Sequence, residues 1–548
     1  MGNDSHNTHD VLNQSPRIGS INLMETDPLL DRTVSGFPDA VRNDLAQSGT
    51  FWGSAEAREF ARLANLAEPE LDRFDAKGHR IDEVAFHPAY HALMRRSVSA
   101  GLHCSAWLND PHEEGLRHRA RAARLYMTAQ TECGHICPMT MTNASFAALR
   151  QAPDIFAAWA PRIFSKTYDR SFRPPSEKKG VTIGMAMTEK QGGSDVRANT
   201  TRAEHSSQDG LFHITGHKWF MSAPMSDAFL MLAQTEEGLS CFLVPRFRFD
   251  GTHNGIRLER LKNKLGNRSN ASCEAEFDEA SGWLIGEEGR GVATILEMVT
   301  LTRLDCAVAS AGLMRAGFAE AVHHLRHRAA FGKTLIDQPL MARVLADMAL
   351  DLAAALALSM RLAEAFDREK DSPAEAAYAR LLTPCVKYWV CKTAPGFLYE
   401  AMECLGGNGY VEESVLPRLY REAPVNAIWE GSGNIMALDV LRAISRDDAQ
   451  IDLVLELLSE ELGGGSSAAT DVLRAAVSVT REDEGAARIL TEQLALTAAA
   501  AALKRDFPPV FADAFVETRL GRPWRATYGM LDARFDLRAV LDYICPEI

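Results

Sequence analysis

The feature that most constrains the fold is a series of long helical patterns in the second half of the chain. Apolar residues recur at three- and four-residue spacing over 292–325, 339–366, 374–403 and 432–444. Several of these patterns are longer than 20 residues. Helices of this length predict an antiparallel four-helix bundle in this part of the chain.

The sequence pattern of the chain before the bundle changes at residue 181. Short runs at 182–187, 211–215, 228–233 and 240–245 are rich in β-forming residues, which predicts a sheet or barrel. This part ends at a glycine-marked connection, 286–291. The first 180 residues instead show helical spacing, at 55–67, 90–107, 116–131 and 143–151.

Together the patterns predict an α+β protein that is mostly α. We expect four parts: an N-terminal α-helical domain over 1–180, a central β domain over 181–288, a helical bundle over 289–445, and an additional helical domain over 446–548. A length of 548 residues suits three or four domains of about 150 residues each. The α–β–α order, with no G-x-G-x-x-G after a strand, argues against a doubly wound nucleotide-binding fold.

Composition excludes several classes of protein. Hydrophobic residues are 46% and charged residues 24%, which is ordinary for a globular protein. The net charge is −14, so contact with nucleic acid would require a local basic patch. The most apolar windows, 352–360 and 494–503, are far shorter than the ~20 residues of a membrane span. The polar N-terminus lacks the apolar core of a signal peptide.

Ten scattered cysteines are typical of a reduced compartment, so we expect a cytoplasmic protein. Cys133, His135 and Cys137 lie close together, but a fourth ligand and a second cluster are missing. We therefore expect a packed helix there and no metal site. For four arginines on one helical pattern we expect a solvated face rather than an anion site: Arg117, Arg119, Arg121 and Arg124.

Two segments suggest a flat or anionic ligand. MTEKQGGSD at 187–195 places a glycine pair beside hydroxyl groups, and glycines let backbone amides approach a ligand closely. A tight turn explains the same loop. RAAFGK at 328–333 begins with Arg328, a planar cation suited to phosphate. The histidines that precede it are not accompanied by the carboxylate or thiolate side chains that a metal site would need. We therefore expect surface or interface residues at His323, His324 and His327.

A third motif consists of two segments, LGGNGY at 405–410 and IWEGSGN at 428–434, and includes a candidate base. Glu430 stands between a bulky aromatic residue and a glycine that could open a helix. A carboxylate against apolar surface has a raised pKa and suits general-base work. A glutamate that caps the next helix fits the pattern equally well.

In this order on an α–β–α chain, these segments resemble the acyl-CoA dehydrogenase family of flavoproteins over about residues 85–445. The stretches 187–195, 257–270 and 416–422 look like the AidB branch of that family. Members of this branch belong to the bacterial adaptive response to DNA alkylation and add a C-terminal helical domain. The resemblance implies a noncovalent FAD, an acyl-CoA substrate and a homotetramer.

The resemblance also implies which residues bind FAD. Phe220 and Ser222 take the places of a family Trp and Thr, with Trp219 as the alternative aromatic wall. Arg328 and Phe331 would reach the FAD of a neighbouring subunit, and Gln338 stands one residue short of the family's glutamine. Glu403 replaces a family Gln, and its carboxylate would repel pyrophosphate unless it is turned away or paired. The full predicted set is Met187, Thr188, Gly193, Ser194, Trp219, Phe220, Met221, Ser222, Arg328, Phe331, Gln338, Gly406, Gly407, Ser432 and Asn434.

By the same resemblance, Glu430 is the catalytic base. The family's other position for the base lies directly before an arginine, here Arg303, and is occupied by Thr302, which cannot take the proton. Arg303 would shape the pocket or hydrogen-bond near Glu430. The implied reaction is α,β-dehydrogenation of a short or branched acyl-CoA at low rate.

Three functions remain open at the level of sequence. They are an AidB-like flavoprotein with weak dehydrogenase activity and a DNA-associated role, a catabolic acyl-CoA dehydrogenase, and a DNA-binding protein with a structural flavin. Candidate contacts to double-stranded DNA are Arg442, Arg519, Arg522 and Arg525. The segment 446–548 has 11 Lys and Arg against 18 Asp and Glu, so a solvated mixed face explains its arginines as well as a basic face does.

Overall fold

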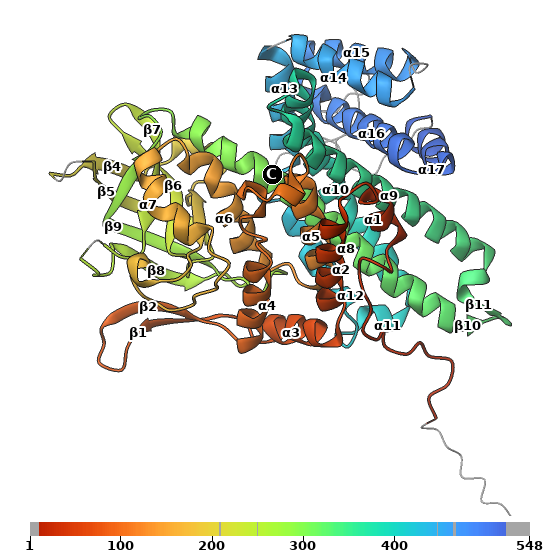
Figure 1. The fold of residues 1–548 in the computed structure, drawn as a ribbon, viewed down its shortest axis with the longest axis horizontal. Helices are drawn as coiled ribbons and strands as arrows, with labels where there is room; N and C mark the ends of the chain where they lie inside the picture. Colours follow the sequence, from red (N-terminus) through yellow and green to blue (C-terminus); the bar gives the residue numbers. More distant parts are fainter. Residues whose placement is uncertain (1–9, 208–209, 249, 447, 464–466, 522–548) are drawn as a thin grey trace, which may run out of the picture.

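The computed structural model describes residues 10–207, 210–248, 250–446, 448–463 and 467–521. A β-sheet unit lies on one side of the molecule and a long-helix bundle on the other (Figure 1). Most N-terminal helices pack against the bundle, whereas the helix at 153–163 lies over the sheet unit (Figure 1). The last helices lie along the upper side of the bundle in this view (Figure 1). One continuous hydrophobic core runs from Leu23 to Phe515 through all three helical parts.

The N-terminal helices begin at clear caps. The Asp27 carboxylate accepts hydrogen bonds from the backbone N–H groups of Leu29 and Leu30, and Ser54 caps the third helix through Ala57. The predicted helix over 90–107 ends early, at Ser99, and a short 3₁₀ turn follows at Ser105–Trp107. The helices are α1 Pro28–Thr33, α2 Asp39–Trp52, α3 Ala55–Leu66, α4 Pro88–Ser99, α5 Arg117–Thr131, α6 Ile136–Leu149 and α7 Pro153–Ile163.

A β-hairpin interrupts these helices, so the prediction that the first 180 residues are helical is wrong there. Strands β1 (Glu70–Phe74) and β2 (Arg80–Ala85) pair antiparallel. Side chains along β1 alternate in exposure, which suits a strand with one covered face. The turn is stabilised by Asp75, whose Oδ1 accepts from the N–H groups of Lys77 and His79.

The prediction of a solvated arginine face on α5 is also wrong. Arg121 and Arg124 are buried and carry ion pairs between helices. Arg121 binds both carboxylate oxygens of Asp305 at 2.6 and 2.8 Å. Helical spacing shows which residues share a face, but not that a second helix covers it.

The central unit is a seven-stranded sheet in the order β3-β5-β4-β6-β7-β9-β8. Additional pairings of β3 with β6 and of β5 with β9 bend the sheet toward closure. Its interior contains apolar side chains such as Phe229, Phe242 and Phe277. The strands are β3 Ile183–Thr188, β4 Arg202–His205, β5 Phe212–Ser222, β6 Ala228–Thr235, β7 Gly238–Pro245, β8 Ile256–Leu261 and β9 Ser272–Ile285.

The predicted bundle is present with nearly the predicted bounds. Long helix α10 packs against α8 and α9, and Ser372 caps its start through the N–H of Glu375. A two-residue β-hairpin, β10 Ala329–Ala330 with β11 Lys333–Thr334, projects from the end of α8 (Figure 1). The helices are α8 Gly291–His327, α9 Pro339–Arg368, α10 Pro373–Cys404, α11 Gly407–Tyr410, α12 Leu416–Asn426 and α13 Gly433–Arg446.

The last helices extend the same core. Helix α16 packs on α9, α10 and α13, and the apolar window 494–503 lies buried within it. In the part of the chain that the structure describes, no helix is both long and apolar enough to cross a membrane. The helices are α14 Asp448–Glu461, α15 Ser467–Glu482, α16 Ala487–Asp506 and α17 Pro509–Phe515.

Candidate active site

Glu430 lies in the turn between α12 and α13 with a left-handed backbone. Its φ is +58°, and Gly431 follows at +102°. A non-glycine residue in this region costs about 1–3 kcal/mol, so surrounding contacts must hold it there. Gly431 suits this turn because a φ of +102° is a backbone conformation that residues with a side chain rarely adopt.

Two neighbouring residues of α8 contact Glu430. The Thr302 hydroxyl donates to Glu430 Oε2 at 2.8 Å, and Arg303 Nε donates to the Glu430 carbonyl at 3.0 Å. The Arg303 guanidinium also pairs with Asp439 at 2.7 Å, and the other oxygen of Asp439 accepts from Arg380. The structure thus brings together the predicted base, the predicted arginine and the threonine of the alternative position.

Lys387 of α10 is a contact that the sequence reasoning missed. Its ammonium donates to the Trp429 carbonyl at 2.7 Å and to the Gly431 carbonyl. Lys387 is 1% exposed. The available signal was a lone lysine inside the apolar run LLTPCVKYWVC at 381–391, where a charge is retained only with buried partners.

The electrostatics suit a base. Burial raises the pKa of Glu430, while the Thr302 hydrogen bond and then the charges of Arg303 and Lys387 oppose that rise. A carboxylate of raised pKa binds a proton more strongly than an exposed one and remains ionised above that pKa.

The predicted flavin-loop residues meet across two strands. Thr188 of β3 pairs with Phe220 of β5, and Met185 pairs with Ser222. Phe220 is 47% exposed beside this pairing. The Trp219 ring is covered by the Lys262 ammonium, 3.3 Å from the ring centroid.

Met221 is a correction to the predicted site. Its side chain is fully buried in the sheet core, because alternate residues of β5 face opposite sides. It cannot contact a ligand beside Phe220 through its side chain.

A buried ion pair anchors the loop that follows β3. Glu189 accepts from Lys218 Nζ at 2.8 Å and from the N–H groups of Thr200 and Thr201. Burial alone would raise the pKa of Glu189, but Lys218 and the hydrogen bonds lower it below its usual value. The Glu189 carboxylate thus joins the two ends of the exposed segment that holds Gly193 and Ser194.

The residues around this loop fit a flavin. Phe220 offers an exposed apolar surface, and hydroxyl groups of Thr188, Ser194 and Ser222 stand near it in sequence and pairing. A Cβ on Gly193 would lie 2.3 Å from Thr188 Oγ1, so the loop approaches the strand too closely for another residue. An apolar face bordered by hydroxyls and a glycine loop matches a ring system that is flat, apolar on its faces and polar along its edges.

The remaining predicted cofactor residues lie elsewhere on the surface. Phe331 is 99% exposed at φ +52°, on the hairpin that projects away from the bundle. Gln338 donates to the Ala330 carbonyl at 3.0 Å and supports that hairpin. Four other residues of the set, together with Glu403, are exposed or reach the surface: Gly406, Gly407, Ser432 and Asn434.

The N-terminal segment holds the same hairpin. Asn13 exchanges two hydrogen bonds with the backbone of Ala329, and Arg328 donates to the Asn13 carbonyl at 2.8 Å. His323 and His324 contact the neighbouring Pro16 and Ser15. These histidines therefore bind protein groups.

His135 has both ring nitrogens occupied. They contact Glu132 at 2.6 Å and Ser97 at 2.9 Å. Across the described ranges, no group of three or more His, Cys, Asp or Glu is arranged to hold a metal ion.

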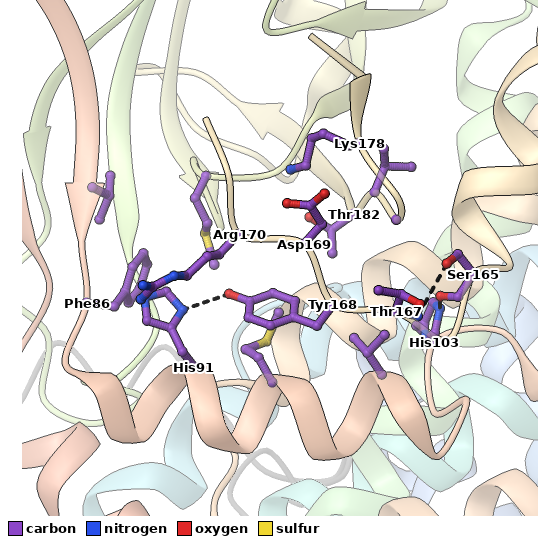
Figure 2. Close-up of a pocket in the computed structure, with 16 residues that line it drawn as sticks. Phe86, His91, His103, Ser165, Thr167, Tyr168, Asp169, Arg170, Lys178 and Thr182 are labelled. Atoms are coloured by element: carbon purple, nitrogen blue, oxygen red, sulfur yellow. Dashed lines mark hydrogen bonds between the residues drawn. The ribbon is translucent and has the colours of Figure 1, made fainter. Parts of the chain in front are cut away.

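A small cavity lies between α4 and the segment 165–182 (Figure 2). Its volume is about 50 Å³, and Figure 2 shows the His91 ring directed at the Tyr168 hydroxyl, a hydrogen bond of 2.8 Å. Burial lowers the pKa of His91 to about 4, so the ring is neutral at pH 7. None of the predicted site residues lines this cavity, and its volume suits water rather than an acyl-CoA.

Comparison with known proteins decides the family. Residues 13–170 match the adaptive response protein AidB N-terminal domain, 184–280 the acyl-CoA dehydrogenase middle domain, and 289–445 its C-terminal domain. The chain is 48% identical over 515 residues to AidB of Escherichia coli (strain K12), covering 94% of each chain. This chain belongs to the acyl-CoA dehydrogenase family. The predicted AidB branch, the fold and the oxidoreductase class are confirmed, as is FAD as the cofactor.

A sequence comparison and a structure comparison with a nematode relative support the family assignment. Acyl-CoA dehydrogenase family member 11 of Caenorhabditis elegans is 34% identical over 442 residues, 77% of this chain and 71% of that one. The crystal structure of Caenorhabditis elegans ACDH-11 in complex with C11-CoA has a TM-score of 0.87 at 28% identity and covers 97% of each chain. The acyl-CoA dehydrogenase fold therefore extends over nearly the whole chain.

The four arginines predicted to contact DNA divide into three groups. Arg442 is exposed on α13. Arg519 is 4% exposed and pairs with Asp347 and Asp351 of α9, so it adds nothing to an exposed basic face, and the prediction for it is wrong. Arg522 and Arg525 lie outside the described residues.

Proposed function

We propose that this protein carries out α,β-dehydrogenation of a short or branched acyl-CoA at low rate, with Glu430 as the base. The observation that carries the proposal is the left-handed turn that presents the Glu430 carboxylate to Thr302 while cations hold its backbone. The ACDH-11 complex with C11-CoA supports an acyl-CoA as the substrate class.

Each residue of the site has a defined task in this reaction. Bound FAD supplies the acceptor for the β-hydride. Glu430 removes the α-proton, and the Thr302 hydroxyl stabilises the carboxylate before transfer. Once Glu430 is protonated, the hydroxyl can donate to the Val299 carbonyl instead, 2.9 Å away. Met187, Thr188, Gly193, Ser194, Phe220 and Ser222 would hold the flavin ring.

Anaerobic titration tests the proposal. We expect short and branched acyl-CoA thioesters to bleach the flavin absorbance slowly, and a C11-CoA thioester serves as the comparison of chain length. If none of these thioesters bleaches the flavin, the dehydrogenase function is wrong. Fast bleaching followed by rapid turnover with an electron acceptor would favour the catabolic alternative.

Thr302→Val should move the acid limb of the pH–rate profile of flavin bleaching to higher pH. The Thr302 hydrogen bond lowers the pKa of Glu430, so its loss raises that pKa further. The base works only when it is ionised. As the pH is lowered, the rate of flavin bleaching should therefore begin to fall at a higher pH in the variant than in the parent. Thr302→Ser, which keeps the hydroxyl, should restore the parent profile. An unchanged acid limb in the valine variant would show that Thr302 does not tune the base.

We further propose a homotetramer in which Arg328 and Phe331 reach the FAD of a neighbouring subunit. The exposed hairpin supports this arrangement, because Phe331 is 99% exposed among the residues that the structure describes. Arg328→Ala should lower FAD retention and loosen the oligomer together, since a ligand held by two chains stabilises both. Absorbance after gel filtration measures the first, and light scattering the second. Loss of one property without the other would contradict the coupling.

A DNA-associated role and a cytoplasmic location complete the proposal. The match of residues 13–170 to the adaptive response protein AidB N-terminal domain supports the first, and the second is supported by the cysteines of the described segments, all of which are free and buried. We keep the boundaries 1–180, 181–288, 289–445 and 446–548 as a proposed division into domains.

Arg442→Ala should weaken binding of duplex DNA about equally for all sequences. Loss of one phosphate contact should flatten the slope of log K against log salt by about one unit. Arg197→Ala, an exposed arginine of the β unit, is the matched control. Absence of any retained duplex in low-salt gel shifts would contradict the DNA role and favour the catabolic enzyme.

A further inference from the structure

We infer that Lys387 is a positioning residue for the catalytic base, because its buried ammonium holds the turn that presents Glu430. This inference rests on the proposed role of Glu430 as the base and adds the device that fixes its direction. Lys387 lies on α10, whereas Glu430 lies in the turn after α12, so the contact joins parts of the chain more than 40 residues apart.

The hydrogen bonds define the orientation of consecutive peptide groups. Lys387 Nζ binds the carbonyls of Trp429 and Gly431, and Arg303 Nε binds the carbonyl between them. The Trp429 carbonyl belongs to the peptide plane before Glu430, and the Glu430 carbonyl to the plane after it. Fixing these two planes fixes the φ and ψ of residue 430, which would otherwise leave the left-handed region.

The lysine is unusual for a purely structural contact. Among the residues that the structure describes, no carboxylate lies within ion-pair distance of Lys387. A buried ammonium with carbonyl partners only is costly, and an apolar side chain of similar length would fill the space on α10 at lower cost. A charged lysine at this position is explained if the turn requires one group that donates to the Trp429 and Gly431 carbonyls at the same time.

The groups that face the ammonium come from three elements. They are Cys306 and Arg303 of α8, Cys391 of α10, and Glu430 itself. Burial raises the pKa of both thiols, so Glu430 is the carboxylic acid of this set on which the lysine charge acts. The lysine charge therefore also favours the ionised form of the base.

The test uses the full-length holoprotein with Lys387→Met and Lys387→Gln. The methionine keeps the length of the stem and loses the donors, whereas the glutamine keeps a neutral donor. Lys504→Met is the matched control, because Lys504 donates to the Leu462 carbonyl in the last helices, away from Glu430. The readouts are FAD content, the Kd of acyl-CoA, the rate of flavin bleaching against pH, and amide hydrogen exchange over 427–434.

We expect Lys387→Met to keep its FAD and to bind acyl-CoA within about threefold of the parent, while bleaching falls on the order of 10²-fold. Hydrogen exchange in the turn should rise by roughly tenfold or more, and the acid limb should move to higher pH. Lys387→Gln should recover part of the rate, and Lys504→Met should match the parent in every readout.

Three results would overturn the inference. The first is bleaching within threefold of the parent. The second is a loss of rate that only follows a loss of FAD, with an unchanged acid limb. The third is failure of both Lys387 variants to fold, which would make the lysine a stability element. Glu430→Gln separates this failure from that of the proposed function: if that variant bleaches normally, the base is wrong, and if it is inactive while Lys387→Met is normal, only the positioning role is wrong.

Discussion

Glu430→Gln should abolish bleaching of the flavin by acyl-CoA while leaving the flavin bound. The amide keeps the shape of the side chain and can still accept from Thr302, but it cannot take the α-proton. Removal of a general base typically costs 10²–10⁴-fold, so stopped-flow reduction should slow by about that factor. The FAD-to-protein ratio and the Kd of acyl-CoA should stay close to those of the parent.

The control for this variant is Glu456→Gln, an exposed glutamate of α14. It should reduce at the parent rate. Equal rates for Glu430→Gln and the parent would show that the α-proton leaves to another group. Loss of FAD from Glu430→Gln would show that Glu430 supports the cofactor rather than the chemistry.

Asp305→Ala should destabilise the helical core by about 3–5 kcal/mol, because it leaves a buried guanidinium without its partner. Arg121 of α5 donates to both oxygens of Asp305 on α8, and Thr140 of α6 donates to Oδ2 at 2.8 Å. One carboxylate thus joins three helices. The urea midpoint followed by far-UV circular dichroism should fall clearly.

Two control variants test whether the unpaired buried charge causes the destabilisation by Asp305→Ala. Arg121→Met combined with Asp305→Leu should recover much of the loss, since neither variant side chain leaves a buried charge. Glu59→Ala breaks the exposed pair with Arg62 and should leave the midpoint unchanged. A small effect of Asp305→Ala would show that water reaches Arg121 when the aspartate is removed.

The sequence predicts the long helices well because their apolar spacing extends over many turns. The pattern at 374–403 corresponds to α10, Pro373–Cys404, within one residue at each end. The β1–β2 hairpin was not predictable in the same way, since strands of five and six residues give only two or three inward positions each.

The site was partly predictable for a similar reason. Glu430 and the loop at 187–195 carry local motifs that the family resemblance identifies. Lys387, Arg380 and Asp439 carry no motif, and their meaning comes only from contacts between distant helices. Met221 shows the converse error, because a motif gives neighbours in sequence but not the side of the strand that each one faces.

The burial of α16 limits how this chain can be divided. Its side chains from Leu494 to Leu503 pack into the same core as α9, α10 and α13. A protein cut before α14 would expose that surface on the bundle, and the released helices would expose the matching one. The C-terminal helices are therefore unsuited to expression as a free-standing fragment or to transplantation by gene fusion, and they are expected to be inherited together with the bundle.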